Sequence, residues 1–129
     1  MEDARVDAPR QPGAALTAHE SALLQRLCAG SWRGAEEARA QLAHARWGGK
    51  DHCGDACFLV DVTALPGLPR IPAHESGPIT TLEVADRDQV LGVLELWTED
   101  GLLYSLDYST LSGPVVEKLP DIRLVAREE

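Results

Sequence analysis

The residue types best suited to bind a metal ion or to act as a nucleophile gather between residues 51 and 57. His52, Cys53 and Cys57 lie there, on a stretch that also holds a glycine. Structural zinc sites use four such ligands in a tetrahedral arrangement, and no second cysteine pair completes the set. Cys28 falls on the apolar face of an expected helix, where a cysteine packs as a small hydrophobic residue. The stretch therefore holds weak metal candidates, with a Cys53–Cys57 disulfide or a plain loop as the alternatives.

Other catalytic signals are weak. A nucleophilic cysteine needs a base held against its thiol, and His52 is only a sequence neighbour of Cys53. His74 and Glu75 have the chemistry of a base and its orienting acid, yet no serine or cysteine lies in a catalytic motif. The chain also lacks a phosphate-binding glycine loop, a dinucleotide fingerprint and a zinc-binding H-E-x-x-H motif. We therefore expect that the protein is not an enzyme and that it has no catalytic residue and no cofactor.

Carboxylates recur once per expected strand, and helices on the other side of the sheet would leave them on one face. Paired carboxylates serve glycoside hydrolysis or metal binding, whereas on a solvated strand they serve solubility. An aromatic anchor within a polar rim is more typical of a protein interface. We therefore expect a binding face with Trp97 and Leu103 at its centre. Its members are Asp61, Glu83, Glu95, Trp97, Leu103 and Asp107.

Composition limits the classes of partner. The 129-residue chain has a formal net charge of -9, which disfavours nucleic acid and anionic membranes because both attract basic surfaces. No apolar run approaches the ~18 residues of a membrane span, and the acidic start is unlike a signal peptide. Three cysteines do not form a disulfide framework. We expect a cytoplasmic protein whose partner is another protein with a basic surface.

Two helices are expected in the first third of the chain. Thr17 followed by Glu20 is a capping box, and apolar residues at helical spacing lead to Gly30, a suitable residue after a last turn. A second helix runs from about Gly34 to His44. Residues 1–14 carry prolines and mixed charges without periodicity, so we expect a disordered leader there and a single domain over 15–129.

A β-hairpin forms the centre of the expected sheet. Two apolar runs, Val90–Trp97 and Leu102–Tyr108, flank an Asp-Gly turn. A three-residue loop that pairs Leu96 with Tyr104 separates apolar from polar side chains better than a two-residue loop. This register directs inward Val90, Leu94, Leu96, Leu102, Tyr104, Leu106 and Tyr108.

Shorter strands complete the sheet. Strands are expected over Phe58–Val62 and Thr80–Val84, with a short one over Ala45–Gly48. Residues 48–56 and the proline-rich residues 64–78 are expected to be loops, and residues 122–125 an edge strand or a tail. The pattern predicts an α+β fold, with two N-terminal helices packed on one face of a mostly antiparallel sheet of about four to six strands.

The order of these features resembles a family of small actinobacterial α+β proteins of unassigned function. The shared motifs are Trp32–Glu37, the Cys53–Cys57 turn and the D-G-x-L hairpin at residues 100–103. The resemblance covers roughly residues 16–120 and implies the same fold, with no catalytic residue to transfer. Asp55 stands where the family's turn has a further cysteine, which weakens a metal site. The strand pair also resembles, at the level of fold, immunity proteins that neutralise polymorphic toxins.

Taken together, the sequence predicts a non-enzymatic cytosolic protein-binding domain, with an immunity or antitoxin inhibitor of a basic partner as the leading example. Three alternatives stay open. They are a small enzyme that uses the strand carboxylates, a zinc-binding module built on His52, Cys53 and Cys57, and an acidic mimic of nucleic acid.

Overall fold

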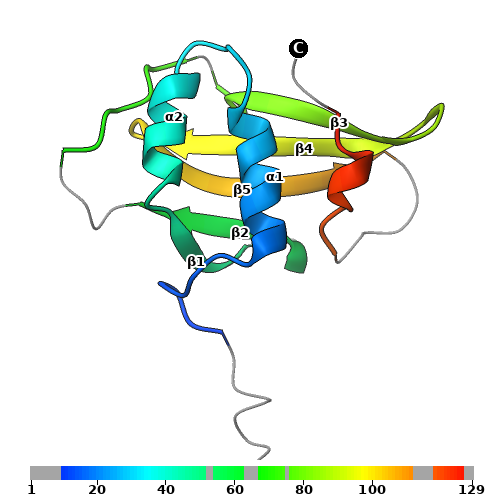
Figure 1. Ribbon diagram of the computed structural model, residues 1–129, viewed down its shortest axis with the longest axis horizontal. Helices are drawn as coiled ribbons and strands as arrows, with labels where there is room; N and C mark the ends of the chain where they lie inside the picture. The colour runs from blue at the N-terminus through cyan, green and yellow to red at the C-terminus, as the bar shows by residue number, and fades with distance from the viewer. Residues whose placement is uncertain (1–9, 52–53, 63–66, 75, 112–117, 127–129) are drawn as a thin grey trace, which may run out of the picture.

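The protein is an α+β domain in which two helices precede a five-stranded antiparallel sheet, as the sequence predicts. The computed structural model describes residues 10–51, 54–62, 67–74, 76–111 and 118–126, with only the backbone of 54–56. The elements are α1 (Ala18–Cys28), α2 (Ala35–Leu42), β1 (Arg46–Asp51), β2 (Gly54–Asp61), β3 (Thr80–Asp86), β4 (Gln89–Glu99), β5 (Leu102–Thr110) and a 3-10 turn, η2 (Ile122–Leu124). The strands lie in the order β1-β2-β5-β4-β3 (Figure 1).

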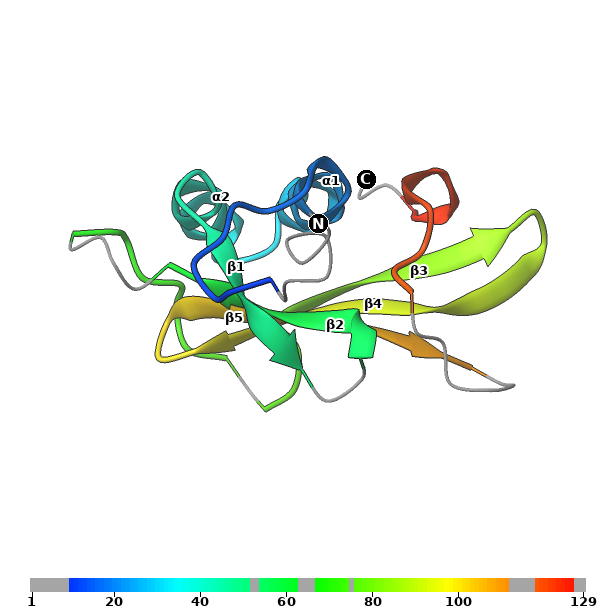
Figure 2. The ribbon, with the colours of Figure 1, turned by 90° about the horizontal axis from the view of Figure 1, so that it is seen from below.

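The sheet has one face covered by helices. Figure 2 shows α1, α2 and η2 side by side on the same side of the sheet. The opposite side, which we call the outer face, carries no helix of the described chain. Leucines of α1 and of the central strands meet between the two layers and are fully or almost fully buried. They are Leu23, Leu24, Leu27, Leu94, Leu96 and Leu106.

The predicted start of α1 is confirmed. The hydroxyl of Thr17 accepts a hydrogen bond from the backbone N–H of Glu20 at 3.0 Å, and the Glu20 carboxylate accepts one from the N–H of Thr17 at 2.9 Å. This capping box satisfies two N–H groups that the first turn leaves without an intrahelical partner. The second helix ends earlier than expected, at Leu42.

The predicted register of the central hairpin is wrong. Asp100 and Gly101 both have positive φ, 55° and 80°, as a two-residue type I′ turn requires. Glu99 therefore pairs with Leu102, and Leu96 pairs with Leu106 instead of Tyr104. The faces of Leu94, Leu96, Leu106 and Tyr108 are nonetheless as predicted, because the shift is two residues and preserves alternation.

A bulge in β5 exchanges two of the predicted faces. The register shifts between Trp97 and Thr98, which pair with Ser105 and Leu103 and leave Tyr104 as the extra residue. Leu103 is consequently 2% exposed in the core, whereas Tyr104 is 43% exposed. The sequence predicts the reverse for both residues. Val90, also expected inward, is exposed.

Strands β1 and β2 replace most of the loop expected over residues 48–56. Glycines have low strand propensity. Gly48 and Gly49 therefore give the sequence of β1 the character of a loop, and its pairing with β2 could not be predicted. At Gly48 a Cβ atom would lie 3.0 Å from the backbone of Leu59, which means that close approach of the two strands needs a glycine there.

Segments near both ends of the described chain lie along the sheet edges. Gly13 donates to the carbonyl of Trp47 at 2.7 Å, and Trp47 donates to that of Ala14 at 2.9 Å, at the edge of β1. Residues 10–14 therefore extend the ordered part beyond the expected boundary, while residues 1–9 lie outside the described residues. At the other edge, Val125 forms an isolated bridge with Val84 of β3. The turn η2 over Ile122–Leu124 and this bridge at Val125 stand in place of the strand or tail expected over 122–125.

Candidate functional site

The strand register brings two carboxylates together on the outer face. Glu95 of β4 and Asp107 of β5 are direct cross-strand partners. Thr81 of β3 pairs with Glu95 on one side, and Cys57 of β2 pairs with Asp107 on the other. Side chains alternate along a strand, and the neighbours Leu94, Leu96 and Leu106 are buried under the helices. Glu95 and Asp107 therefore project to the outer face.

Trp97 lies beside this pair. Its indole N–H donates a hydrogen bond of 3.3 Å to Oε1 of Glu95. The ring is partly buried, with some surface accessible. Its cross-strand partner Ser105 is only 3% exposed, and Leu59 pairs with Ser105 on β2. Trp97, Ser105 and Leu59 are therefore neighbours across three strands, next to the two carboxylates.

The carboxylates are only partly solvated. Glu95 and Asp107 are both intermediate in exposure, and Oδ1 of Asp107 is buried from solvent. Like charges directly opposite each other on a sheet are destabilising. Two carboxylates side by side attract a positively charged ligand group through their combined charge.

Glu83 completes the acidic set. Glu83 is exposed on β3 and pairs with Val93 of β4. It lies two residues along β3 from Thr81, the partner of Glu95, and so on the same face of the sheet. We call Glu83, Glu95, Trp97 and Asp107 the acidic face. These are four of the six residues that the sequence predicts for binding.

The other two predicted residues lie elsewhere. Leu103 is in the core because the bulge turns it toward the helices. Asp61 is opposite Arg46 at the far end of β2 and lines a hollow that α1 and α2 also border. The prediction was wrong for Leu103 because a bulge exchanges the faces of a strand.

No sequence pattern indicates this hollow, which has a volume of about 810 Å³. Its walls come from Gly13, Ala15 and Leu16, from α1, from the end of α2, from the start of β1 and from the end of β2. The polar side chains among its lining residues are Ser21, Gln25, His44, Arg46 and Asp61. They come from distant parts of the chain, so no local spacing marks them.

The cysteines fall into two kinds. Cys57 is disulfide-bonded, whereas Cys28 is a free, fully buried thiol whose pKa burial raises to about 12. A thiol with that pKa is protonated near neutral pH and is a poor nucleophile or metal ligand. His52 and Cys53, the other two metal candidates, lie outside the described residues. Within the described ranges, no three histidine, cysteine, aspartate or glutamate residues cluster as a metal site would require.

Comparisons add no relative from which a role could be transferred. No protein-family model, curated protein or solved structure matches the chain. Across the described segments, the helices are too short or too polar to traverse a membrane.

Proposed function

We propose that the chain is a non-enzymatic protein-binding domain that uses the acidic face to bind a basic surface of another protein. Within this class we propose an inhibitor of the immunity or antitoxin type, acting in the cytosol. The observation that carries the proposal is the direct opposition of Glu95 and Asp107 beside the partly accessible ring of Trp97.

The chemistry of this arrangement fits a guanidinium group. An arginine side chain can bind a carboxylate through two parallel N–H···O bonds and can stack on an indole ring. Glu95 and Trp97 are already held together by the bond between them, so less side-chain freedom is lost on binding. The acidic face therefore suits an arginine as the central contact of the partner.

The charge of the whole chain supports the same partner. A net charge of -9 attracts a basic protein over distances of about one Debye length, roughly 8–10 Å at physiological salt. Such attraction mainly raises the association rate, whereas close contacts determine dissociation. Association should therefore slow steeply as salt is added, while dissociation changes less.

A pair of matched double variants tests the proposal, with a short peptide of alternating arginine and serine as the probe. Glu95→Gln with Asp107→Asn removes two charges from the acidic face. Glu36→Gln with Asp88→Asn removes two charges from exposed positions on α2 and on the β3–β4 turn. Both variants have the same net charge, so long-range attraction is equal.

We expect the acidic-face variant to bind the peptide at least about tenfold more weakly, the loss of about 1.4 kcal/mol. The control should stay within about threefold of the wild type. Equal weakening in the two variants would contradict the proposal, because it would show attraction to overall charge without a specific site.

A further inference from the structure

A short segment before α1 packs across the edge of the sheet. We call residues Arg10–Leu16 the strap. Ala14 donates to the carbonyl of Gln11 at 3.1 Å, and Gly13 has φ of +96°, which together describe a tight turn with glycine in its left-handed position. Gly13 and Ala14 of this turn exchange two backbone hydrogen bonds with Trp47 of β1.

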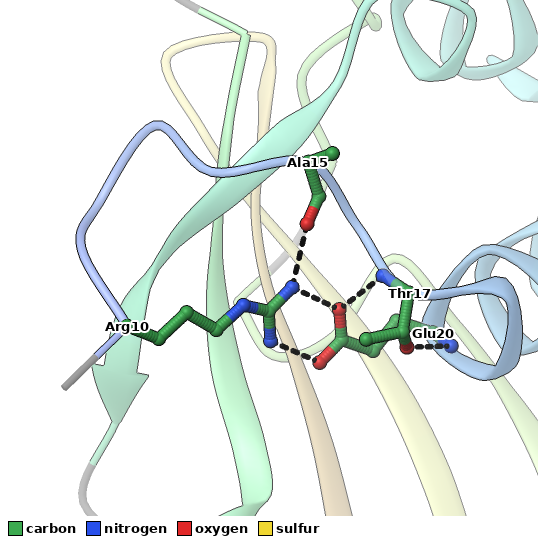
Figure 3. A network of polar contacts seen from close by, with 4 residues as sticks. All are labelled: Arg10, Ala15, Thr17 and Glu20. Carbon is green, nitrogen blue, oxygen red and sulfur yellow. Dashed lines mark hydrogen bonds and ion pairs between the residues drawn. The ribbon is translucent and has the colours of Figure 1, made fainter. Parts of the chain in front are cut away.

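The side chain of Arg10 makes three hydrogen bonds and an aromatic contact from the strap. Arg10 donates to both oxygens of Glu20, at 2.7 and 2.9 Å, and to the carbonyl of Ala15 at 2.7 Å (Figure 3). Its guanidinium carbon also lies 4.3 Å from the ring centroid of Trp47. Arg10 therefore makes both a bidentate ion pair and a cation–π contact.

The contacts of Arg10 are separable from those that hold α1. Glu20 accepts the N–H of Thr17 and donates its own N–H to the Thr17 hydroxyl, so the capping box does not need Arg10. The strap has no fully buried residue: only Ala14 and Leu16 pack against the core, both partly buried, and residues 11–13 and 15 are exposed. Segments with few buried apolar contacts open locally at low cost, while the rest of the fold stays intact.

Opening would uncover two features at once. The N–H and C=O of Trp47 that now bond to the strap would become available at the edge of β1. Gly13, Ala15 and Leu16 also form one wall of the 810 Å³ hollow, so its side would open. A sheet edge with available N–H and C=O groups binds extended chains.

We propose that the strap is a displaceable cover, with Arg10 as its latch, over a site that accepts an extended, arginine-bearing segment of a partner chain. The strap shows how such a segment binds. Its backbone pairs with Trp47, and its guanidinium fits between the Glu20 carboxylate and the Trp47 ring. A partner segment with an arginine in the same position can replace each of these contacts. This edge is distinct from the acidic face.

Hydrogen exchange of individual amides tests the latch in the full-length protein. Arg10→Ala removes the two hydrogen bonds to Glu20, the one to the Ala15 carbonyl and the contact with the Trp47 ring. This variant should speed exchange of the Trp47 amide at least about tenfold. Exchange at Phe58 and Leu106, in the core of the sheet, should stay unchanged. The matched control is Arg33→Ala, which removes an exposed arginine between the helices. Arg10→Lys should fall between, because lysine keeps the charge but not the fork.

Two outcomes would overturn the latch. An unchanged Trp47 amide in Arg10→Ala would show that Arg10 does not hold the strap. Equal acceleration at Trp47, Phe58 and Leu106 would show that Arg10 supports the whole fold and that the strap does not open alone.

A second arm tests the site beneath the strap. A synthetic peptide of residues 10–17 with blocked ends, at millimolar concentration, is added to the Arg10→Ala protein. It should restore protection of the Trp47 amide, whereas the same peptide with alanine for its arginine should not. Failure of the arginine peptide to restore protection would overturn the assignment of this edge as a binding site.

Discussion

The Oε1 of Gln41 accepts a hydrogen bond of 2.8 Å from the backbone N–H of Leu103. The same side chain donates through Nε2 to the carbonyls of Pro69 and Gly101, each at 2.8 Å. Gln41 is fully buried, so one amide group ties α2 to the proline-rich segment and to the β4–β5 turn. These bonds stabilise the bulge that turns Leu103 toward the core.

Replacing Gln41 with methionine should be strongly destabilising. Methionine fills a similar volume but makes none of the three bonds, and the N–H of Leu103 is left buried without a partner. Each such group costs about 1–3 kcal/mol, so we expect a loss of about 3 kcal/mol or more in the free energy of unfolding. Urea unfolding measures this loss. The control is Gln25→Met at an exposed position, where the loss in the free energy of unfolding should be under about 0.5 kcal/mol. A loss in Gln41→Met as small as that in the control would contradict the assigned role.

Gln41 also explains why the register could not be predicted. The sequence around the hairpin shows an Asp-Gly turn and alternating residues, which were enough to predict the two strands and their central inward residues. The bulge depends on a hydrogen bond to a residue 62 positions away, and local patterns carry no such information. Leu103 was consequently assigned to the wrong face.

Features that depend on neighbouring residues could be predicted from the sequence, whereas features that depend on distant segments could not. The capping box of Thr17 and Glu20 spans four residues and was predicted in full. The pairing of β1 with β2 was missed because glycines signal loops unless a neighbouring strand supplies the hydrogen bonds. Glu83, Glu95, Trp97 and Asp107 share a face because strand alternation is local, whereas the hollow is lined by distant segments.

Acidification should weaken the fold through Glu20. Burial by itself raises the pKa of this carboxyl, but hydrogen bonds from Arg10 and Thr17 outweigh it and leave the pKa below its ordinary value of 4.5. The stabilisation is therefore complete above about pH 4.5 and is lost as the pH falls through the lowered pKa. Arg10→Ala removes part of this effect, so its stability deficit should shrink between pH 6 and pH 3.5. Urea unfolding at the two pH values checks this, and a deficit that does not change would contradict it.

Cys28 should be unreactive in the folded protein. With a pKa raised to about 12 by burial, roughly one thiol in ten thousand is ionised at pH 8, since each pKa unit is a factor of ten. A disulfide exchange reagent such as dithionitrobenzoate should therefore label Cys28 only after unfolding. Stoichiometric labelling of the native protein within minutes would contradict the buried position.

Reduction of the disulfide at Cys57 should leave the protein folded. A cytosolic location requires this, because thiols are kept reduced there. The β1–β2 pairing and the helix-covered core supply the main stabilisation, and we expect the loss to be at most about 3 kcal/mol. Thermal unfolding with and without reducing agent should show a cooperative transition in both cases. Loss of the transition on reduction would argue against the cytosol.

The central claim is that the acidic face is a specific site for a basic partner. Its most direct test is a titration of the isotope-labelled protein with the arginine-serine peptide, followed by nuclear magnetic resonance. The resonances of the Trp97 indole N–H and of the Glu95 and Asp107 amides should shift together and saturate. Shifts spread evenly over all exposed acidic residues, with the Trp97 indole unmoved, would contradict it.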